Sequence, residues 1–278
     1  MLDARKPLID QLVALGAVTP VNRRFVESYQ LPRIGRIHEL IRKHAPAPLP
    51  LRVLNIGLLD GLVPLSLLQL DEHLTITSTE RPKANIEQSA GPAALQATGR
   101  HDVATLDLTA RDALPEAEYD WVVCGEVLEH LPSPSLPQAM RNLRDAAEKA
   151  VITTPNLHAL RYRLRHVIGV DFQHDPVPDP AMGLGHVSLL SARLLIDLAA
   201  DAGLSVTDLE FHSWTSRARG KGVRALSKLA NPFPSLADDL VAAFRRDEHV
   251  QPSVMYGGVA VSMRDGSRAA LGRAYRRR

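Results

Sequence analysis

The chain has 278 residues, 45% hydrophobic and 4% aromatic, which is enough for one large α/β domain with an aliphatic core. Its 33 basic and 31 acidic residues give a net charge of +2, which argues against a protein dedicated to coating nucleic acid. The single cysteine, Cys124, excludes an intramolecular disulfide. Residues 51–70 are apolar but contain charged residues and a proline, and the N-terminus lacks a signal-peptide pattern. We therefore expect a cytoplasmic protein without a membrane span.

Residues 1–46 are predicted to form helices. Apolar residues recur at helical spacing in two stripes, one around Leu8 and Leu12 and one around Ile34 and Ile37. The proline-rich stretch 45–50 then marks a stiff boundary. We interpret 1–46 as an N-terminal helical cap on a larger domain.

The pattern changes after residue 50, where short apolar runs alternate with helical segments. Strands are predicted at 52–57, 73–80, 102–107, 119–124 and 150–154, and helices at 62–70, 85–95 and 136–149. Strands that alternate with helices at this spacing indicate a parallel sheet covered on both faces.

The C-terminal part is predicted to complete this sheet. A helix at 189–203 and a strand at 204–214 precede a polar-faced helical insertion at 217–250 and a last strand at 256–263. The fold class is therefore α/β: a doubly wound, mostly parallel sheet of seven strands with a terminal antiparallel hairpin and N-terminal helices. The main domain is placed at 50–264 and a basic tail, either solvated or phosphate-binding, at 265–278.

Ligands of an open parallel sheet bind beyond the carboxyl ends of its strands, so the residues that follow each strand deserve particular scrutiny. Gly57 and Gly61 follow the first strand and let the backbone turn sharply toward a ligand or simply into the next helix. Glu80 ends the second strand, where an acid can bind both ribose hydroxyls or remain on the surface. Asp107 and Leu108 end the third strand, where Asp107 can meet a purine amino group or cap the turn at 109–112.

The segment after the fourth strand holds several candidate functional residues close together in the sequence. Glu126, Glu129 and His130 stand at i, i+3 and i+4, so a helical turn here would place all three side chains on nearly one face. Two carboxylates and an imidazole that converge at a strand end need a cation, a shared proton or strong hydrogen bonds. We therefore predict a functional site at this segment. The long irregular stretch 157–187 is typical of a substrate lid.

Taken in this order, these motifs resemble those of the class I S-adenosylmethionine-dependent methyltransferases over about residues 50–264. The resemblance is to the subgroup with Glu-Val-Leu-Glu-His after the fourth strand, Thr-Pro-Asn after the fifth and Gly-His before the next helix. The matching segments are Asn55–Gly61, Glu80, Glu126–Leu131, Thr154–Asn156 and Gly185–His186. Two positions depart from the subgroup: Asn55 replaces the usual acid, and Leu59 replaces the middle glycine.

The resemblance implies S-adenosyl-L-methionine as the cofactor and assigns roles by position. The implied cofactor-binding residues are Asn55, Gly57, Gly61, Glu80, Asp107, Leu108 and Glu126. Arg33 or Arg36, on the helix before the sheet, is a further candidate for the cofactor carboxylate. His130 is the candidate base, because its ordinary pKa suits proton removal from an acceptor, and Glu129 or Glu126 orients it.

Three functions remain open. The first is O-methylation of a small hydroxylated acceptor such as a sugar, glycan or natural product, favoured by polar and basic residues at 161–165 and 174–179. The second is a metal-dependent O-methyltransferase acting on a diol, a quinone precursor or an RNA end, with a divalent metal held by Glu126, Glu129, His130 and His186. The third is a catalytically degenerate methyltransferase fold that serves as a binding protein. We expect a small-molecule or glycan partner rather than a nucleic acid.

Overall fold

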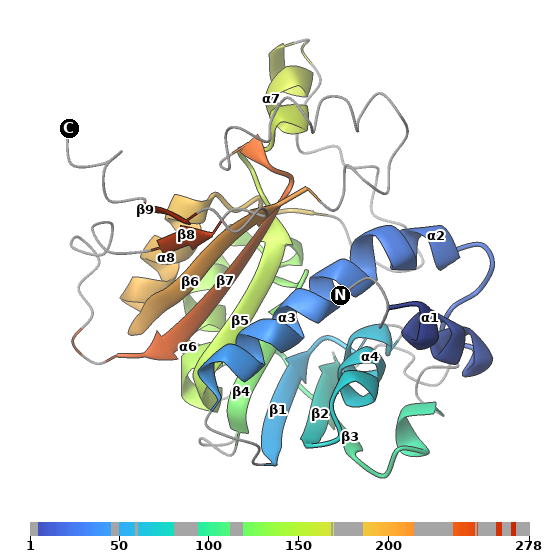
Figure 1. Ribbon diagram of the computed structural model, residues 1–278. Coiled ribbons are helices and arrows are strands. Elements are labelled where there is room, and N and C mark those ends of the chain that lie inside the picture. The colour runs from blue at the N-terminus through green and yellow to red at the C-terminus, as the bar shows by residue number, and fades with distance from the viewer. Residues whose placement is uncertain are drawn as a thin grey trace.

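The computed structural model describes residues 5–45, 50–58, 61–80, 94–111, 119–167, 169, 186–213, 236–247, 249, 260–262 and 268–270. Within these residues the chain forms one mixed sheet with helices on both faces (Figure 1). The strands are β1 (Leu51–Ile56), β2 (Leu74–Glu80), β3 (His101–Thr105), β4 (Tyr119–Gly125), β5 (Ala147–Pro155), β6 (Leu204–His212), β7 (Asp239–Arg246), β8 (Ala260–Ser262) and β9 (Arg268–Ala270).

The strand order is β3-β2-β1-β4-β5-β7-β6, with the short strands β8 and β9 beyond β6. Strands β1 to β5 are parallel, whereas β7 is antiparallel to both β5 and β6. The expected sheet of seven strands, mostly parallel with a terminal antiparallel hairpin, is confirmed. The direction of winding reverses between β1 and β4, and at such a switch point the loops after the two strands diverge and leave a crevice.

The helices are α1 (Arg5–Ala14), α2 (Arg23–Phe25), the π-helix η1 (Val26–Gln30), α3 (Leu31–His44), α4 (Leu62–Leu70), α6 (Leu136–Ala146), α7 (Leu160–Val167) and α8 (Ala192–Asp201). Two short 3₁₀ turns, η3 (Leu128–His130) and η4 (Ser133–Ser135), follow β4. A helical N-terminal region is thus confirmed. Among the described residues, no helix is both long and apolar enough to cross a lipid bilayer.

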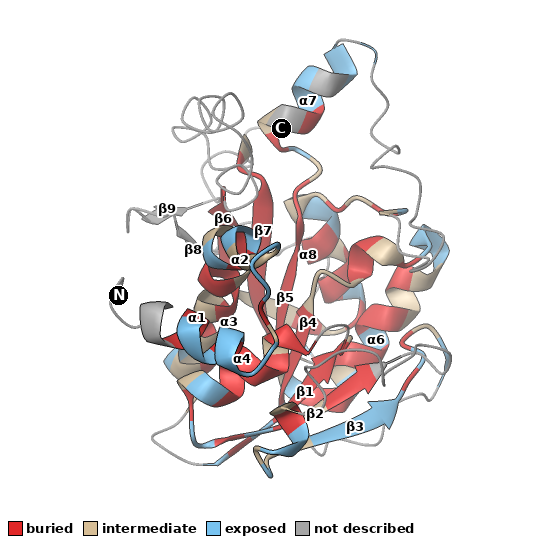
Figure 2. Ribbon diagram, turned by 90° about the vertical axis from the view of Figure 1, so that its right-hand side faces the viewer, coloured by how far each residue is buried: buried red, intermediate tan, exposed pale blue. Residues whose placement is uncertain are grey.

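The helices on each face of the sheet pack against it through a hydrophobic core. On one face, Ile34, Ile37 and Leu40 are fully buried at helical spacing, and α3 packs with α1 and α4 against the sheet. On the other face, α6 and α8 cover the sheet through residues such as Met140 and Leu195. The central strands are buried throughout much of their length, as expected for strands with helices on both sides (Figure 2).

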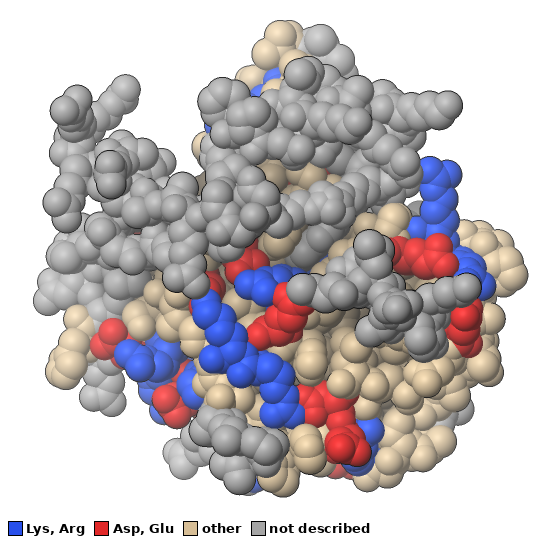
Figure 3. All heavy atoms as spheres, in the orientation of Figure 1, with Lys and Arg blue, Asp and Glu red and all other residues tan. Residues whose placement is uncertain are grey.

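The outer side of α3 carries charges of both signs, and acidic and basic side chains intermingle on this face of the molecule (Figure 3). Arg36 pairs with Glu210 on β6, Arg42 pairs with Asp71, and Lys43 pairs with Asp208. Burial by itself disfavours ionisation of Glu210. Hydrogen bonds from His212 and Arg36 outweigh it and lower the pKa of the Glu210 carboxyl to about 2. The pairs with Asp208 and Glu210 tie α3 to β6, and the pair with Asp71 ties it to the end of α4.

The predicted helical insertion at 217–250 is wrong over Asp239–Arg246, which forms β7. A run of six buried residues with two alanines fits a buried helix and a buried strand equally well. Its position between β5 and β6, where both neighbours supply backbone hydrogen bonds, decides for the strand. Residues 214–235 lie outside the described part of the chain.

Smaller corrections concern element ends. The helix predicted to reach residue 149 ends at Ala146, because Ala147 is already extended and begins β5. The partner of β6 in the hairpin is β7, whereas the residues of the predicted last strand that are described form β8, parallel to β6. Part of the predicted basic tail, Arg268–Ala270, pairs with β8. An open sheet edge offers unpaired backbone groups to such a segment.

Candidate functional site

The loop after β1 has the backbone that its glycines predicted. Gly57 has φ +84° and Gly61 has φ +75°, a region that costs other residues about 1 kcal/mol or more. Asn55 is buried, and its amide donates to the Gly57 carbonyl at 2.9 Å. An asparagine thus holds this loop where the subgroup has an acid. Leu59 lies outside the described residues.

The absence of a side chain at Gly57 also brings two loops together. A Cβ atom at this position would lie 3.2 Å from Cγ2 of Val127, in the loop after β4. That distance is tighter than ordinary van der Waals contact, so a larger residue would push the loops apart. Gly57 therefore sets the spacing between the carboxyl ends of β1 and β4.

The ends of β2 and β3 lie beside this loop. Glu80 is the last residue of β2, and its backbone pairs with Thr105. Asp107 is exposed, and its Oδ1 accepts from the amide of Thr109 at 2.9 Å and from its hydroxyl at 2.7 Å. Leu108 is buried, and its carbonyl accepts from Asn142 at 2.7 Å. Asp107 thus caps its own turn and still faces solvent with its side chain.

A pocket of about 250 Å³ opens where these segments meet. Its lining comes from the ends of β1 and β2, the loop after β3 and the loop after β4: Ile56, Gly57, Thr79, Leu106, Asp107, Leu108, Thr109, Val127, Leu131, Pro132 and Ser135. The pocket therefore lies at the switch point of the sheet, where the topology places a ligand. Three predicted cofactor-binding residues, Gly57, Asp107 and Leu108, line it.

Glu126 leaves the path of a helix as soon as β4 ends. Among the described residues it is the non-glycine with positive φ, at +57°, and the 3₁₀ turn η3 begins two residues later. The predicted single helical face is therefore wrong for Glu126, because the left-handed residue breaks the helical course and Glu126 is not part of the group formed by Glu129, His130 and His186. Tyr29 donates to Glu126 Oε2 at 2.7 Å, and Thr153 donates to Oε1 at 3.0 Å.

Arg33 completes the surroundings of Glu126. This arginine is 3% exposed, and its Nη1 lies 3.3 Å from Glu126 Oε1. The suggested role of Arg33 or Arg36 at a cofactor carboxylate thus meets two arginines already paired, Arg33 with Glu126 and Arg36 with Glu210. Burial and then the charge of Glu126 raise the pKa of Tyr29 well above its usual value, so the phenol remains a hydrogen-bond donor.

Glu129 lies in the opposite electrostatic situation. It is fully buried, Thr154 donates to its Oε2 at 3.2 Å, and its Oε1 has no hydrogen-bond partner among the described residues. Burial and then the charge of Glu126 raise the pKa of the Glu129 carboxyl well above its ordinary value. An isolated buried carboxylate is costly, so this group calls for a proton or a cation.

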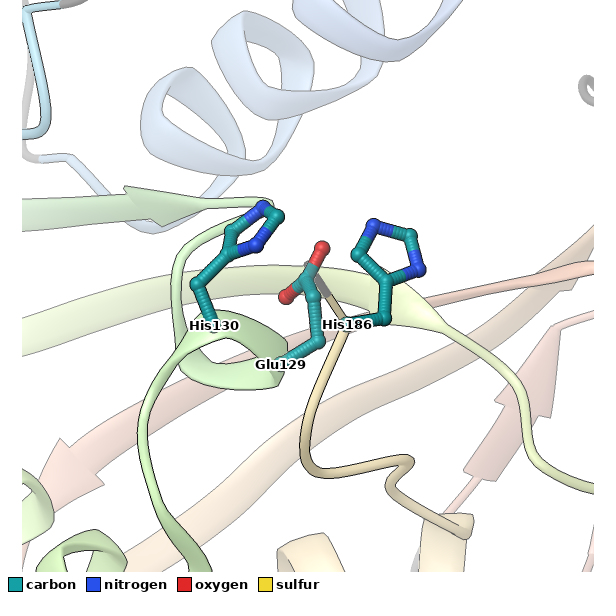
Figure 4. A group of neighbouring side chains, drawn as sticks. All are labelled: Glu129, His130 and His186. Atoms are coloured by element: carbon teal, nitrogen blue, oxygen red, sulfur yellow. The ribbon is translucent and has the colours of Figure 1, made fainter. Parts of the chain in front are cut away.

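Two imidazoles flank the Glu129 carboxylate. One ligand atom from each of Glu129, His130 and His186 lies within 4.8 Å of the others, and both rings stand beside the carboxylate (Figure 4). The rings of His130 and His186 are 4.9 Å apart between centroids. The backbone next to His186 is bound to that of Glu129, because the amides of Val187 and Ser188 both donate to the Glu129 carbonyl. Three of the four predicted metal ligands converge here, and Glu126 is not part of the group.

The donor set fits a divalent cation. One carboxylate and two imidazoles suit zinc, iron or manganese, and the bare Oε1 of Glu129 is a buried acceptor that such an ion would satisfy. The same set also suits proton transfer, since an imidazole beside a carboxylate can accept a proton from a hydroxyl. In either role, as metal ligands or as a base, the group adjoins the pocket. Val127 and Leu131, which flank Glu129 and His130 in the sequence, both line the pocket.

Sequence reasoning missed the residues that support this site. Tyr29, Thr153 and Asn142 were not identified, and Thr154 was quoted only as part of a motif. Thr153, Thr154 and Asn142 share one signal, a polar residue at a position that the surrounding apolar pattern buries, whereas Tyr29, between Ser28 and Gln30, lacks it. Such a signal identifies a buried polar residue without telling which partner it meets.

The sequence matches a family model described as a methyltransferase domain over residues 29–209. No curated protein matches it. The structure is similar to magnesium protoporphyrin IX methyltransferase from Synechocystis PCC 6803 with bound SAH, at 14% identity over 83% of this chain and 89% of that one, with a TM-score of 0.56. It is also similar to the O-methyltransferase of a trans-AT PKS multienzyme from Brevibacillus brevis, in complex with S-adenosyl-L-homocysteine, at 18% identity over 84% and 78% of the two chains, with a TM-score of 0.53.

A third similar structure is that of the [4+2]-cyclase SpnF, at 15% identity over 76% of this chain and 81% of that one, with a TM-score of 0.51. At these identities the likeness to solved structures establishes a shared fold. Because the cyclase has this fold too, the reaction has to be argued from the site.

Proposed function

Because the chain belongs to the methyltransferase domain family, we propose that it methylates a hydroxyl oxygen of a small hydroxylated acceptor, such as a sugar, a glycan or a natural product, with S-adenosylmethionine as the donor. The observation that carries this proposal is the pocket at the switch point, beside the group Glu129, His130 and His186, in which Glu129 is buried and the two histidines are partly exposed. Donor pocket and proton-accepting groups adjoin, as methyl transfer to a hydroxyl requires.

The pocket has the chemistry to hold an adenosyl group. Its lining includes Gly57, which has no side chain, the buried apolar residues Leu106 and Leu108, and the exposed Asp107, which offers a carboxylate. We assign Asn55, Gly57 and Gly61 to the shape of the loop and Glu80 to the ribose, by its place at the end of β2. S-adenosylmethionine, once bound, supplies an electrophilic methyl group, and the chain aligns it with the acceptor and excludes water.

His130 is the proposed base. Its ring lies beside Glu129, whose carboxylate can orient the imidazole and stabilise its protonated form (Figure 4). The acceptor hydroxyl would enter from the side of the segment 186–188, which is tied to the Glu129 backbone. A polar acceptor is favoured by the basic residues of α7, on the chain segment between β5 and His186; residues 174–179 lie outside the described part of the chain.

Calorimetric titration with S-adenosylhomocysteine tests the proposal directly. We expect saturable binding with one site per chain, and release of S-adenosylhomocysteine when S-adenosylmethionine is supplied with sugars, glycans or phenolic acceptors in turn. If the folded protein shows no heat of binding with either compound, the enzyme proposal fails. The degenerate fold acting as a binding protein would then be the better description.

A second candidate is metal-dependent O-methylation of a diol, a quinone precursor or an RNA end. It is favoured by one specific observation, the buried Glu129 Oε1 that no described residue satisfies, with two imidazoles beside it. Glu129, His130 and His186 would hold the ion, which would lower the pKa of a coordinated acceptor hydroxyl. Glu126 is engaged by Tyr29, Thr153 and Arg33 and is not proposed as a ligand.

Manganese titration followed by electron paramagnetic resonance separates the two candidates. For the metal-dependent enzyme, the wild-type protein binds one Mn²⁺, and His186→Ala weakens binding at least tenfold, since each ligand contributes substantially to a three-residue site. The matched control is His38→Ala, which removes a histidine paired with Asp71 outside the site. Equal affinity in the wild type and His186→Ala would leave His130 as a metal-free base.

A further inference from the structure

We propose that Tyr29 and Arg33, from the N-terminal helices, are positioning residues that fix the loop after β4 by holding the carboxylate of Glu126. This inference rests on the proposed function, because the loop that they hold carries Val127, in the wall of the donor pocket, and the group Glu129–His130. Among the described residues that line the pocket neither Tyr29 nor Arg33 is found, and Arg33 reaches the Glu129 carboxyl only through its charge, which by itself lowers the pKa of that group. They act through Glu126.

The backbone of Glu126 needs external support. A glutamate at φ +57° is strained by its Cβ, and such a residue persists where the surroundings over-determine it. Its amide donates to the Thr153 carbonyl at 2.9 Å, which anchors one end of the residue. The side chain supplies the further anchors, because its carboxylate binds partners on η1, α3 and β5.

Both oxygens of the Glu126 carboxylate are engaged. Oε2 accepts from the Tyr29 hydroxyl at 2.7 Å, and Oε1 accepts from the Thr153 hydroxyl at 3.0 Å, with Arg33 Nη1 3.3 Å away. Hydrogen bonds to an ionised group are short and strong. The carboxylate is thus gripped from η1, from α3 and from β5 together.

Tyr29 and Arg33 are also held by contacts other than those with Glu126. Tyr29 is 7% exposed and Arg33 3% exposed, the guanidinium lies 5.4 Å from the Tyr29 ring centroid, and Gln30 accepts from Arg33 Nη2. Tyr29 belongs to the π-helical turn η1 and Arg33 to the first turn of α3, four residues later. The wide turn sets the rotation at which both side chains reach the end of the sheet, and such turns are frequent at functional sites.

Val127 connects Glu126 to the pocket. Val127 follows Glu126, and its Cγ2 lies where a Cβ of Gly57 would almost touch it. A shift of Glu126 therefore changes the gap between the loops after β1 and β4, which forms the wall of the donor pocket. The N-terminal helices thereby influence the shape of a pocket whose described lining contains none of their residues.

The test removes a single oxygen. Tyr29→Phe keeps the ring, whose centroid lies 4.9 Å from that of Phe25 in a tilted arrangement, and deletes the hydroxyl that donates to Glu126. Tyr119→Phe, at the amino end of β4, is the matched control. We expect amide hydrogen exchange in residues 126–131 of the unliganded protein to accelerate roughly tenfold in Tyr29→Phe, and S-adenosylhomocysteine binding to weaken by a similar factor. Tyr119→Phe should change neither.

A second variant shows whether the effect runs through Glu126. Glycine adopts positive φ without strain, so in a Glu126→Gly background the Tyr29→Phe change should no longer alter exchange in residues 127–131. Unchanged exchange in Tyr29→Phe, or an equal effect of Tyr29→Phe with and without Glu126, would overturn the inference. The exchange readout needs no ligand, so a protein that binds no S-adenosylhomocysteine would refute the proposed function and leave this result to be judged by itself.

Discussion

Two glutamates that lie three residues apart meet opposite environments at the end of β5. Glu126 contacts Thr153 on the side of α3, where a tyrosine and an arginine satisfy its carboxylate. Glu129 contacts Thr154 on the opposite face of β5, where one of its oxygens has no hydrogen-bond partner in the described part of the chain and two histidines stand beside it. The alternation of side chains along β5 separates the two. The satisfied carboxylate is thereby suited to hold structure, and the unsatisfied one to bind or react.

The largest expected effect comes from Glu129→Gln, which removes the unsatisfied charge while keeping the shape. Turnover should fall at least about a hundredfold, because a group that orients the base or holds a metal is lost. Stability at neutral pH should stay equal or rise, since burial of this carboxylate is costly. Steady-state kinetics and thermal melts of the same preparation measure both. A clear loss of stability with retained turnover would reverse the assignment of the two glutamates.

The converse variant, Glu126→Gln, should act mainly on the fold. It leaves Arg33 buried beside a neutral amide, and breaking a buried pair by removing one partner costs about 3 kcal/mol. Because the Glu126 side chain is 19% exposed, we expect a smaller loss, about 2 kcal/mol, in the free energy of unfolding. Urea denaturation measures it. Residues 127–131 should also loosen as in Tyr29→Phe, and unchanged amide hydrogen exchange there would show that the Glu126 carboxylate does not hold the loop.

Gly57→Ala probes the contact between Gly57 and Val127, which links the residue after Glu126 to the pocket at the switch point. The added Cβ meets Val127 and a positive φ, so we expect about 1–2 kcal/mol of lost stability and weaker S-adenosylhomocysteine binding. Gly35→Ala is the matched control, because a Cβ there meets nothing within 4 Å and alanine favours the helix α3. Equal behaviour of the two variants in calorimetry would show that the two loops are not in close contact.

Glu210 offers a third carboxylate, satisfied like Glu126 but remote from the pocket. Its pKa in the fold, about 2, lies below the ordinary 4.5, so its stabilisation is present above pH 4.5 and is lost as the pH falls toward 2. Glu210→Gln should lower the free energy of unfolding by about 1–2 kcal/mol at pH 7, discounted for the partly exposed Arg36. Between pH 2 and 7, the free energy of unfolding of Glu210→Gln should therefore change less with pH than that of the wild type.

Local pattern was sufficient to predict most of the fold. The helix 62–70 has the predicted limits, and the strands β1, β2 and β4 differ from prediction by a residue at their ends. The helical prediction for 239–246 failed because a buried apolar run carries no period, and because its partners β5 and β6 lie far away in the sequence. The sharp backbone turns at the glycines of the first loop were predictable, since they depend on local backbone geometry alone.

The site divides in the same way. The residue types at the strand ends follow from sequence order, because a parallel sheet gathers its carboxyl ends at one edge. The pairing of those residues does not follow from order. Glu126 left the expected helical face because Tyr29 and Arg33, about a hundred positions earlier, give its carboxylate a better environment. His186, fifty-six positions after His130, reached Glu129 because the amides of Val187 and Ser188 bind the Glu129 carbonyl. Pattern identified the chemical groups, and long-range hydrogen bonds of buried charges chose their partners, because a buried charge takes whichever partner the packed chain brings within reach.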